Sequence, residues 1–131
     1  MLAWNISITR QNSSFIRRMI PATTKTERGK FIAAWYANCG GLEWIEKLIA
    51  NKKVICLRKG FYPGLYTGKA KNILPTIQEI PPYVADKYEW IEDKATGKQI
   101  LHSSKDFGKS EQEMDSCNNE EWLRIEIWDL S

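Results

Sequence analysis

The last twelve residues, EEWLRIEIWDLS, contain the pattern that most restricts the fold of this chain. Leu123, Ile125 and Ile127 alternate with other residues, a period typical of a β-strand with one face against a core. The opposite face would contain Trp122, Arg124, Glu126 and Trp128. Two alternatives stay open: an exposed face that contacts a partner, or a central strand covered on both faces, with the two charged side chains paired.

Further strands are indicated by similar patterns. The alternation of Leu2, Trp4, Ile6 and Ile8 with small or polar residues predicts an N-terminal strand. Residues 54–57, VICL, form a short apolar run that predicts a buried strand. Residues 87–92 and 98–102 flank a glycine-containing turn at 93–97, which predicts a β-hairpin.

Two segments have apolar residues at helical spacing. Residues 24–38 start with Thr24 and Glu27 at capping-box spacing and stop before Gly40 and Gly41. Residues 42–53 repeat the helical pattern, so the two segments predict a helical hairpin. A further short helix is expected within residues 70–80, and the polar residues 103–120 are expected to form a loop.

These elements predict an α+β fold. At 131 residues the chain has the length of one domain, spanning residues 1–131, and can bury a substantial core. We expect a mostly antiparallel sheet made of the N-terminal strand, a central strand, the hairpin and the C-terminal strand. The helical hairpin would pack on that sheet.

Composition narrows the class of protein. With 43% hydrophobic and 27% charged residues, the chain falls in the ordinary globular range. It has neither an apolar run near the roughly 20 residues that span a bilayer nor a signal-peptide pattern, so we expect a cytoplasmic protein without a membrane partner. Cys39, Cys56 and Cys117 are irregularly spaced and lack paired-ligand motifs, which predicts free thiols and no metal site.

Charge is distributed unevenly along the chain. Residues 1–75 contain thirteen Lys or Arg and three Glu, a net charge of +10. Residues 76–131 contain six Lys or Arg and thirteen acids, a net charge of −7. Such a division indicates either separate binding faces for partners of opposite charge or two halves that attract each other in the fold.

Catalytic patterns do not converge. The loop from Gly60 to Lys71 resembles a phosphate-binding loop only loosely, because three residues instead of four separate Gly64 from Gly68 and Ala70 replaces the required hydroxyl. His102 is the only histidine, and no nucleophile has a recognisable base and orienting group around it. We therefore expect a protein that is not an enzyme and has no cofactor.

A protein-binding face is the leading expectation. Aromatic residues and arginine dominate the energetic centres of interfaces, and the acidic surroundings would attract a larger protein with a basic surface. The predicted face consists of Trp122, Arg124, Glu126 and Trp128 with the acidic residues Glu111, Glu113, Asp115, Glu120 and Glu121. The function expected from it is that of an inhibitor, immunity protein or phage counter-defence factor acting on a larger protein, with nucleic-acid-binding proteins among the candidate targets.

The alternative is a nucleic-acid-binding protein that uses its basic N-terminal half. Lysine and arginine would contact phosphates while tyrosines stack on bases. The residues predicted for this role are Arg58, Lys59, Tyr62, Tyr66, Lys69 and Lys71.

Overall fold

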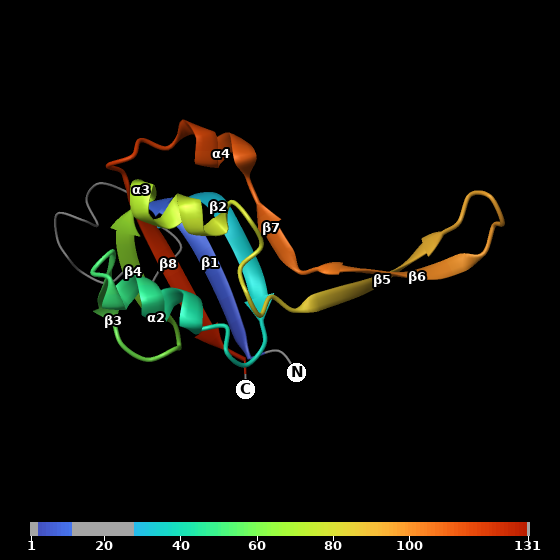
Figure 1. The fold of residues 1–131 in the computed structure, drawn as a ribbon, viewed down its shortest axis with the longest axis horizontal. Helices are drawn as coiled ribbons and strands as arrows, with labels where there is room; N and C mark the ends of the chain where they lie inside the picture. The colour runs from blue at the N-terminus through green and yellow to red at the C-terminus, as the bar shows by residue number, and fades with distance from the viewer. Residues whose placement is uncertain (1–2, 12–27, 131) are drawn as a thin grey trace.

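A computed structural model describes residues 3–11 and 28–130. They form a six-stranded antiparallel sheet in the order β3-β4-β8-β1-β2-β7, together with a separate two-stranded ribbon, β5-β6 (Figure 1). The strands of the sheet are β1 (Trp4–Gln11), β2 (Arg28–Ala37), β3 (Val54–Arg58), β4 (Gly64–Lys69), β7 (Phe107–Lys109) and β8 (Trp122–Asp129). The remaining elements are α2 (Glu43–Ala50), α3 (Ala70–Ile73), the 3-10 helix η2 (Leu74–Ile77), β5 (Asp86–Glu92), β6 (Gln99–Lys105) and α4 (Glu111–Ser116).

The C-terminal strand lies in the centre of the sheet. Ile127 pairs with Ile6 of β1 on one side and with Gly64 of β4 on the other. Its alternating pattern therefore has the predicted period, and β8 joins the β3-β4 pair to the β1-β2-β7 group. This central position gives β8 a hydrogen-bonded neighbour on each of its two edges.

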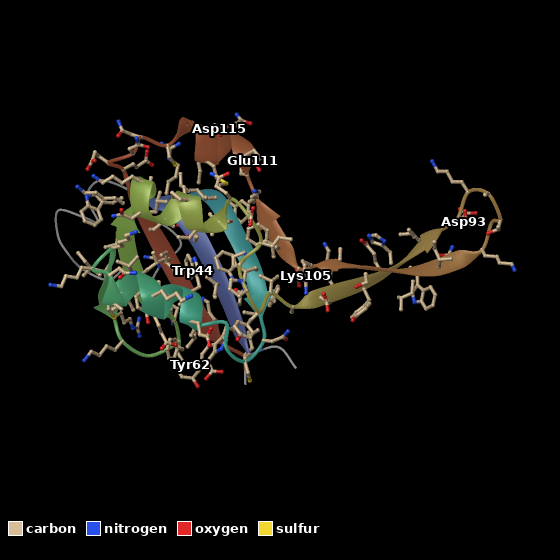
Figure 2. The ribbon with its side chains drawn as sticks, in the orientation of Figure 1. Trp44, Tyr62, Asp93, Lys105, Glu111 and Asp115 are labelled. Carbon is tan, nitrogen blue, oxygen red and sulfur yellow. The ribbon has the colours of Figure 1, made fainter. Side chains whose placement is uncertain are left out.

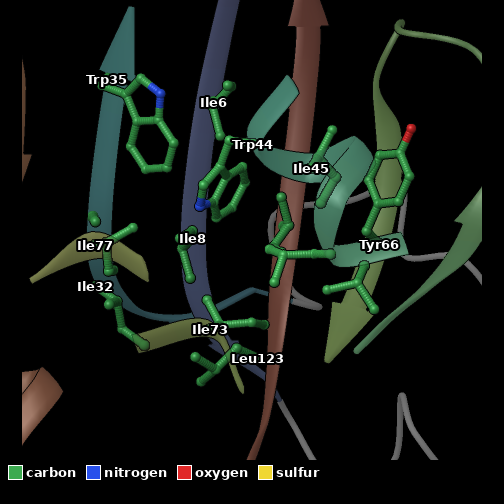
Figure 3. Packing of buried hydrophobic residues seen from close by; sticks show 14 of the residues in the cluster. Ile6, Ile8, Ile32, Trp35, Trp44, Ile45, Tyr66, Ile73, Ile77 and Leu123 are labelled. Carbon is green, nitrogen blue, oxygen red and sulfur yellow. The ribbon is translucent and has the colours of Figure 1, made fainter. Parts of the chain in front are cut away.

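One face of the sheet packs against α2, α3 and η2 (Figures 1 and 3). Isoleucines from β1 and β8 lie beneath Ile45 of α2 and Ile73 of α3, all of them buried. Trp44 of α2 meets Trp35 of β2 edge to face, with ring centroids 5.1 Å apart, and its indole nitrogen donates a hydrogen bond to Thr76 Oγ1 at 2.9 Å. Burial of these side chains is the main stabilising contribution of the helical layer.

The predicted helical hairpin is not confirmed. Of its two helices, the second is present as α2, whereas residues 28–37 of the first form strand β2. The predicted caps Thr24 and Glu27 lie outside the described residues. Ala33, Trp35 and Ala37 alternate on the core side of β2 and pair with β1, so tertiary strand pairing overrides the local helical spacing.

Two other expectations also need correction. The strand at residues 54–57 exists as β3, but it is an edge strand and Ile55 is 45% exposed. The predicted loop at 103–120 contains the end of β6, all of β7 and helix α4, which Ser110 caps by accepting a hydrogen bond from Glu113 N. These short elements were not predicted, because their sequences have few apolar residues and contacts with residues far away in the sequence hold them in place.

Close packing beneath β4 allows a stability prediction at Gly68. A Cβ at this position would lie 2.6 Å from the carbonyl oxygen of Lys53 and 3.0 Å from side-chain atoms of Ile73 and Val54. Gly68→Ala should therefore lower the free energy of unfolding by about 1–3 kcal/mol, measured by urea denaturation. Gly108→Ala is the matched control, since nothing lies within 4 Å of its added Cβ; equal losses for both variants would contradict the packing argument.

Candidate functional site

The β5-β6 ribbon extends away from the sheet and its helices, and we call residues 86–105 the arm (Figure 1). The hairpin predicted from sequence is present, with Trp90 paired to Leu101 and Ile91 paired to Ile100. Its predicted place in the main sheet is wrong, because β5 and β6 form a separate two-stranded sheet. Asp93 lies at the far end of the arm and Lys105 at its base (Figure 2). Strands of seven residues give an arm about 20 Å long, from a rise of about 3.3 Å per residue.

Local hydrogen bonds shape the tip of the arm. Gly97 N donates to the carbonyl oxygen of Asp93 at 2.7 Å, and Asp93 N donates to the carbonyl oxygen of Lys98 at 2.8 Å. The hydroxyl of Thr96 donates to the Asp93 carboxylate at 3.0 Å. Gly97 has a φ of 70°, a left-handed conformation that glycine adopts without steric cost. The turn therefore fixes the register of the two strands.

The base of the arm is tied to strand β2. Ala85 N donates to the carbonyl oxygen of Tyr36 at 2.8 Å, and Asp106 N donates to the carbonyl oxygen of Ala85 at 2.8 Å. Lys105 and Asp86 form an ion pair of 2.9 Å where the ribbon begins. The two strands of the arm thus leave the body from a hydrogen-bonded support, which fixes the point from which the arm extends.

Large apolar side chains lie on both faces of the arm and remain in solvent. Tyr88, Trp90 and Leu101 share one face and are 62%, 67% and 55% exposed. Ile91 and Ile100 lie on the opposite face at 39% and 46% exposure. Isolated two-stranded ribbons are only marginally stable in water, and contiguous exposed apolar surface marks interaction sites. The apolar residues of the arm therefore do not belong to the core, and their composition is that of an interaction surface.

The arm as a whole is electrically neutral. Its four carboxylates are balanced by its four lysines: Asp86, Glu89, Glu92 and Asp93 against Lys87, Lys94, Lys98 and Lys105. A surface that binds nucleic acid needs an excess of positive charge to neutralise phosphates. The arm is consequently suited to an apolar protein surface with charges of both signs around it.

The structure divides the predicted protein-binding face. Arg124 and Glu126 are 1% and 4% exposed, and Arg124 Nη2 donates to the Glu126 carboxylate at 2.5 Å. Trp128 is 36% exposed, while Trp122 is half-buried. For Arg124 and Glu126, the structure agrees with the second alternative, a central strand with a buried ion pair. These two residues therefore do not contribute to an accessible docking face.

The acidic residues predicted for the same face are largely engaged by basic residues. Arg10 of β1 binds both carboxylate oxygens of Glu121 at 2.6 Å and one oxygen of Glu113 at 3.1 Å. These hydrogen bonds, first that to Glu121, raise the pKa of Arg10. Glu120 pairs with Lys69 and Lys71. Contact between the basic and acidic parts of the chain therefore offsets much of the charge difference seen in the sequence.

Glu111 and Asp115 lie exposed on α4 (Figure 2). Glu111 forms an ion pair of 3.1 Å with Lys109. A role of these two residues in binding a partner stays a prediction.

The residues predicted for nucleic-acid binding lie at separate places. Tyr66 is buried against the core at 6% exposure. Arg58, Lys59 and Tyr62 lie near the β3-β4 connection, whereas Lys69 and Lys71 lie at the other end of β4. About 15 Å of strand separates the two groups, estimated from the rise per residue. The six residues therefore do not form one continuous site.

Residues 3–11 and 28–130 contain neither a candidate metal centre nor a candidate membrane-spanning helix. No group of three or more His, Cys, Asp or Glu side chains in these ranges could hold a metal ion. The three cysteines are free, and burial raises the pKa of the Cys117 thiol. None of the helices in these ranges has the length and apolar character needed to traverse a bilayer.

Known proteins offer no guide to this site. No protein-family model, curated protein or solved structure matches the chain. The arm residues Tyr88, Trp90 and Leu101 were missing from the sequence-based site. A signal was nevertheless present, because the apolar pairs Trp90-Ile91 and Ile100-Leu101 leave the predicted hairpin without a polar face for solvent.

Proposed function

We propose that this protein is a non-catalytic binding module that docks on a larger protein through its arm. The observation that supports the proposal is the 67% exposure of Trp90, at the middle of a ribbon with apolar residues on both faces. Tryptophan is strongly enriched among the residues that dominate interface energies. A partner would cover Trp90 together with Tyr88 and Leu101.

The expected partner presents an apolar groove with a mixed-charge rim. Apolar residues occupy the middle of the arm, while Asp93, Lys94 and Lys98 surround its tip. The zero net charge of the arm favours a groove without a strong potential over a highly basic or acidic surface. An arm about 20 Å long can enter a cleft and block it. Inhibition of the partner, as by an immunity or counter-defence protein, is the corresponding functional proposal.

A photo-crosslinking experiment tests this function. A benzophenone amino acid placed at Tyr88 or Leu101 should crosslink the same protein in cells, because both positions share one face of the arm. Tyr62 is a matched control position, as it is 69% exposed but lies in the β3-β4 connection. The purified partner should then bind the intact chain and fail to bind a variant in which a two-residue turn replaces residues 88–103.

Three outcomes are distinguishable. A shared crosslinked protein that requires the arm for binding supports the proposal. Crosslinks only between copies of this chain, together with a dimer in sedimentation equilibrium, would instead make the arm an oligomerisation element. Equal crosslinking from Tyr62 and from the arm would contradict the assignment of the docking surface.

A further inference from the structure

A basic cleft lies at the end of the sheet where β3 and β4 meet α3. It has a volume of about 210 Å³ and is lined by Lys52, Lys53, Ile55, Lys69, Lys71, Asn72 and Trp122. Pairing of Lys69 with Trp122 and of Val54 with Gly68 brings residues from three adjacent strands to this place. The cleft is therefore built by the register of the sheet.

Among the described residues, the lining of the cleft has four lysines and no carboxylate. Within the described parts of the chain, Lys52 and Lys53 form no ion pair, while Lys69 and Lys71 share Glu120. Four positive charges around a small volume produce a strong local attraction for anions. The cleft thus has the charge expected of a phosphate-binding site.

Trp122 provides a flat surface beside these charges. It is half-buried, and Lys69 Nζ lies 5.7 Å from the centroid of its ring. Ile55, 45% exposed, adds an apolar surface on the neighbouring edge strand. Bases stack on aromatic side chains while lysines contact the adjacent phosphate, so this combination fits a nucleotide better than an inorganic anion.

Glu120 already binds two of the lysines that line the cleft. Its two carboxylate oxygens accept hydrogen bonds from Lys69 Nζ at 2.7 Å and from Lys71 Nζ at 2.6 Å. Its side chain is 57% exposed and therefore has room to move away. Phosphate oxygens accept hydrogen bonds from lysine in the same way, so a ligand could replace Glu120 between the two ammonium groups.

We propose that this cleft binds a nucleotide, free or at the end of a single strand, and that Glu120 competes with its phosphate for Lys69 and Lys71. The site is independent of the arm and of the proposed docking function. It contains two of the residues predicted for nucleic-acid binding and adds Lys52, Lys53 and Trp122, which come from different parts of the sequence.

Competition by Glu120 should persist over the neutral and mildly acidic range. Hydrogen bonds from Lys69 and then Lys71 lower the pKa of Glu120 to about 2. A carboxyl with a depressed pKa stays ionised until the pH falls toward that value. Between pH 4 and pH 8, therefore, mutation rather than protonation is the way to remove the competing charge.

The test uses AMP, inorganic phosphate and a 5′-phosphorylated ten-nucleotide deoxythymidine strand as probes, in isothermal titration calorimetry at low salt. Glu120→Gln should bind AMP about tenfold more tightly than the natural sequence, corresponding to about 1.4 kcal/mol. Lys69→Gln/Lys71→Gln should lose this binding. Trp122→Leu should weaken the binding of AMP but not that of phosphate, whereas Trp122→Phe should retain AMP binding. Thermal unfolding of each variant should confirm that it is folded at the temperature of the titration.

Lys94→Gln/Lys98→Gln is the matched control, because it removes two positive charges from the tip of the arm. It should leave AMP binding unchanged. Tighter binding of the strand, with a steep dependence on salt, would assign the site to nucleic acid, and equal affinity for AMP and strand would assign it to free nucleotides. Absence of AMP and strand binding by Glu120→Gln, or an equal loss in the arm control, would overturn the proposal.

Discussion

Arg124→Met should lower the free energy of unfolding by about 3–5 kcal/mol, the largest effect expected of a single charged residue here. Arg124 and Glu126 lie two residues apart on central strand β8 and are 1% and 4% exposed. Removal of the guanidinium leaves the Glu126 carboxylate in a site from which water is largely excluded. Urea denaturation monitored by tryptophan fluorescence measures the change.

Two further variants separate charge burial from simple loss of packing. Arg124→Met/Glu126→Leu should recover most of the loss, because apolar replacement of a buried pair is often nearly neutral. Lys105→Met breaks the Lys105–Asp86 pair, whose side chains are 47% and 45% exposed, and should cost at most about 1 kcal/mol. A single Arg124→Met variant as stable as Lys105→Met would contradict the buried-pair argument.

Trp90→Ala should weaken binding of the crosslinked partner about 30-fold, equivalent to about 2 kcal/mol. The large effect follows from the position of Trp90 between Tyr88 and Leu101 on one face of the arm. Because Trp90 makes no contribution to the core, the unfolding transition of the body should remain unchanged. Surface plasmon resonance with purified partner provides the affinity.

Tyr62→Ala is the appropriate comparison for Trp90→Ala. Tyr62 is exposed to the same degree, 69% against 67%, but lies on the body, away from the arm (Figure 2). The Tyr62→Ala substitution should change the affinity for the partner by less than about twofold, as expected of a residue outside the interface. A loss for Tyr62→Ala as large as that for Trp90→Ala would move the docking surface to the body.

The local sequence pattern was sufficient to predict several secondary-structure elements. The period of two in β1 and β8, the amphipathic spacing of α2 and the turn at Gly97 each correspond to an observed element. Residues 28–37 could not be assigned in this way, because two patterns overlap there. Phe31, Ala34 and Trp35 have helical spacing, whereas Ala33, Trp35 and Ala37 have strand spacing. Pairing with β1, which the local sequence does not encode, determines the strand.

Prediction of the site was less complete, for a similar reason. The sequence placed Trp122 and Arg124 on one strand face, but the local pattern does not show that Arg124 is buried and Trp122 half-buried. Likewise, Lys53 and Lys69 meet only through the register of β3 with β4. Whether a hairpin packs against the rest of the protein or extends away from it is also a tertiary property. The exposure of Trp90 could therefore not be predicted from the sequence.

The position of β8 has a consequence for folding of the chain. Trp4 pairs with Asp129, which is far from it in the sequence, and among the described strands β8 alone lies between β4 and β1. Until β8 has taken its place, the β3-β4 pair and the β1-β2 pair have edges that lack their common neighbour. Unpaired edges attract other chains, so a folding intermediate without β8 in the sheet should be the species most prone to aggregation.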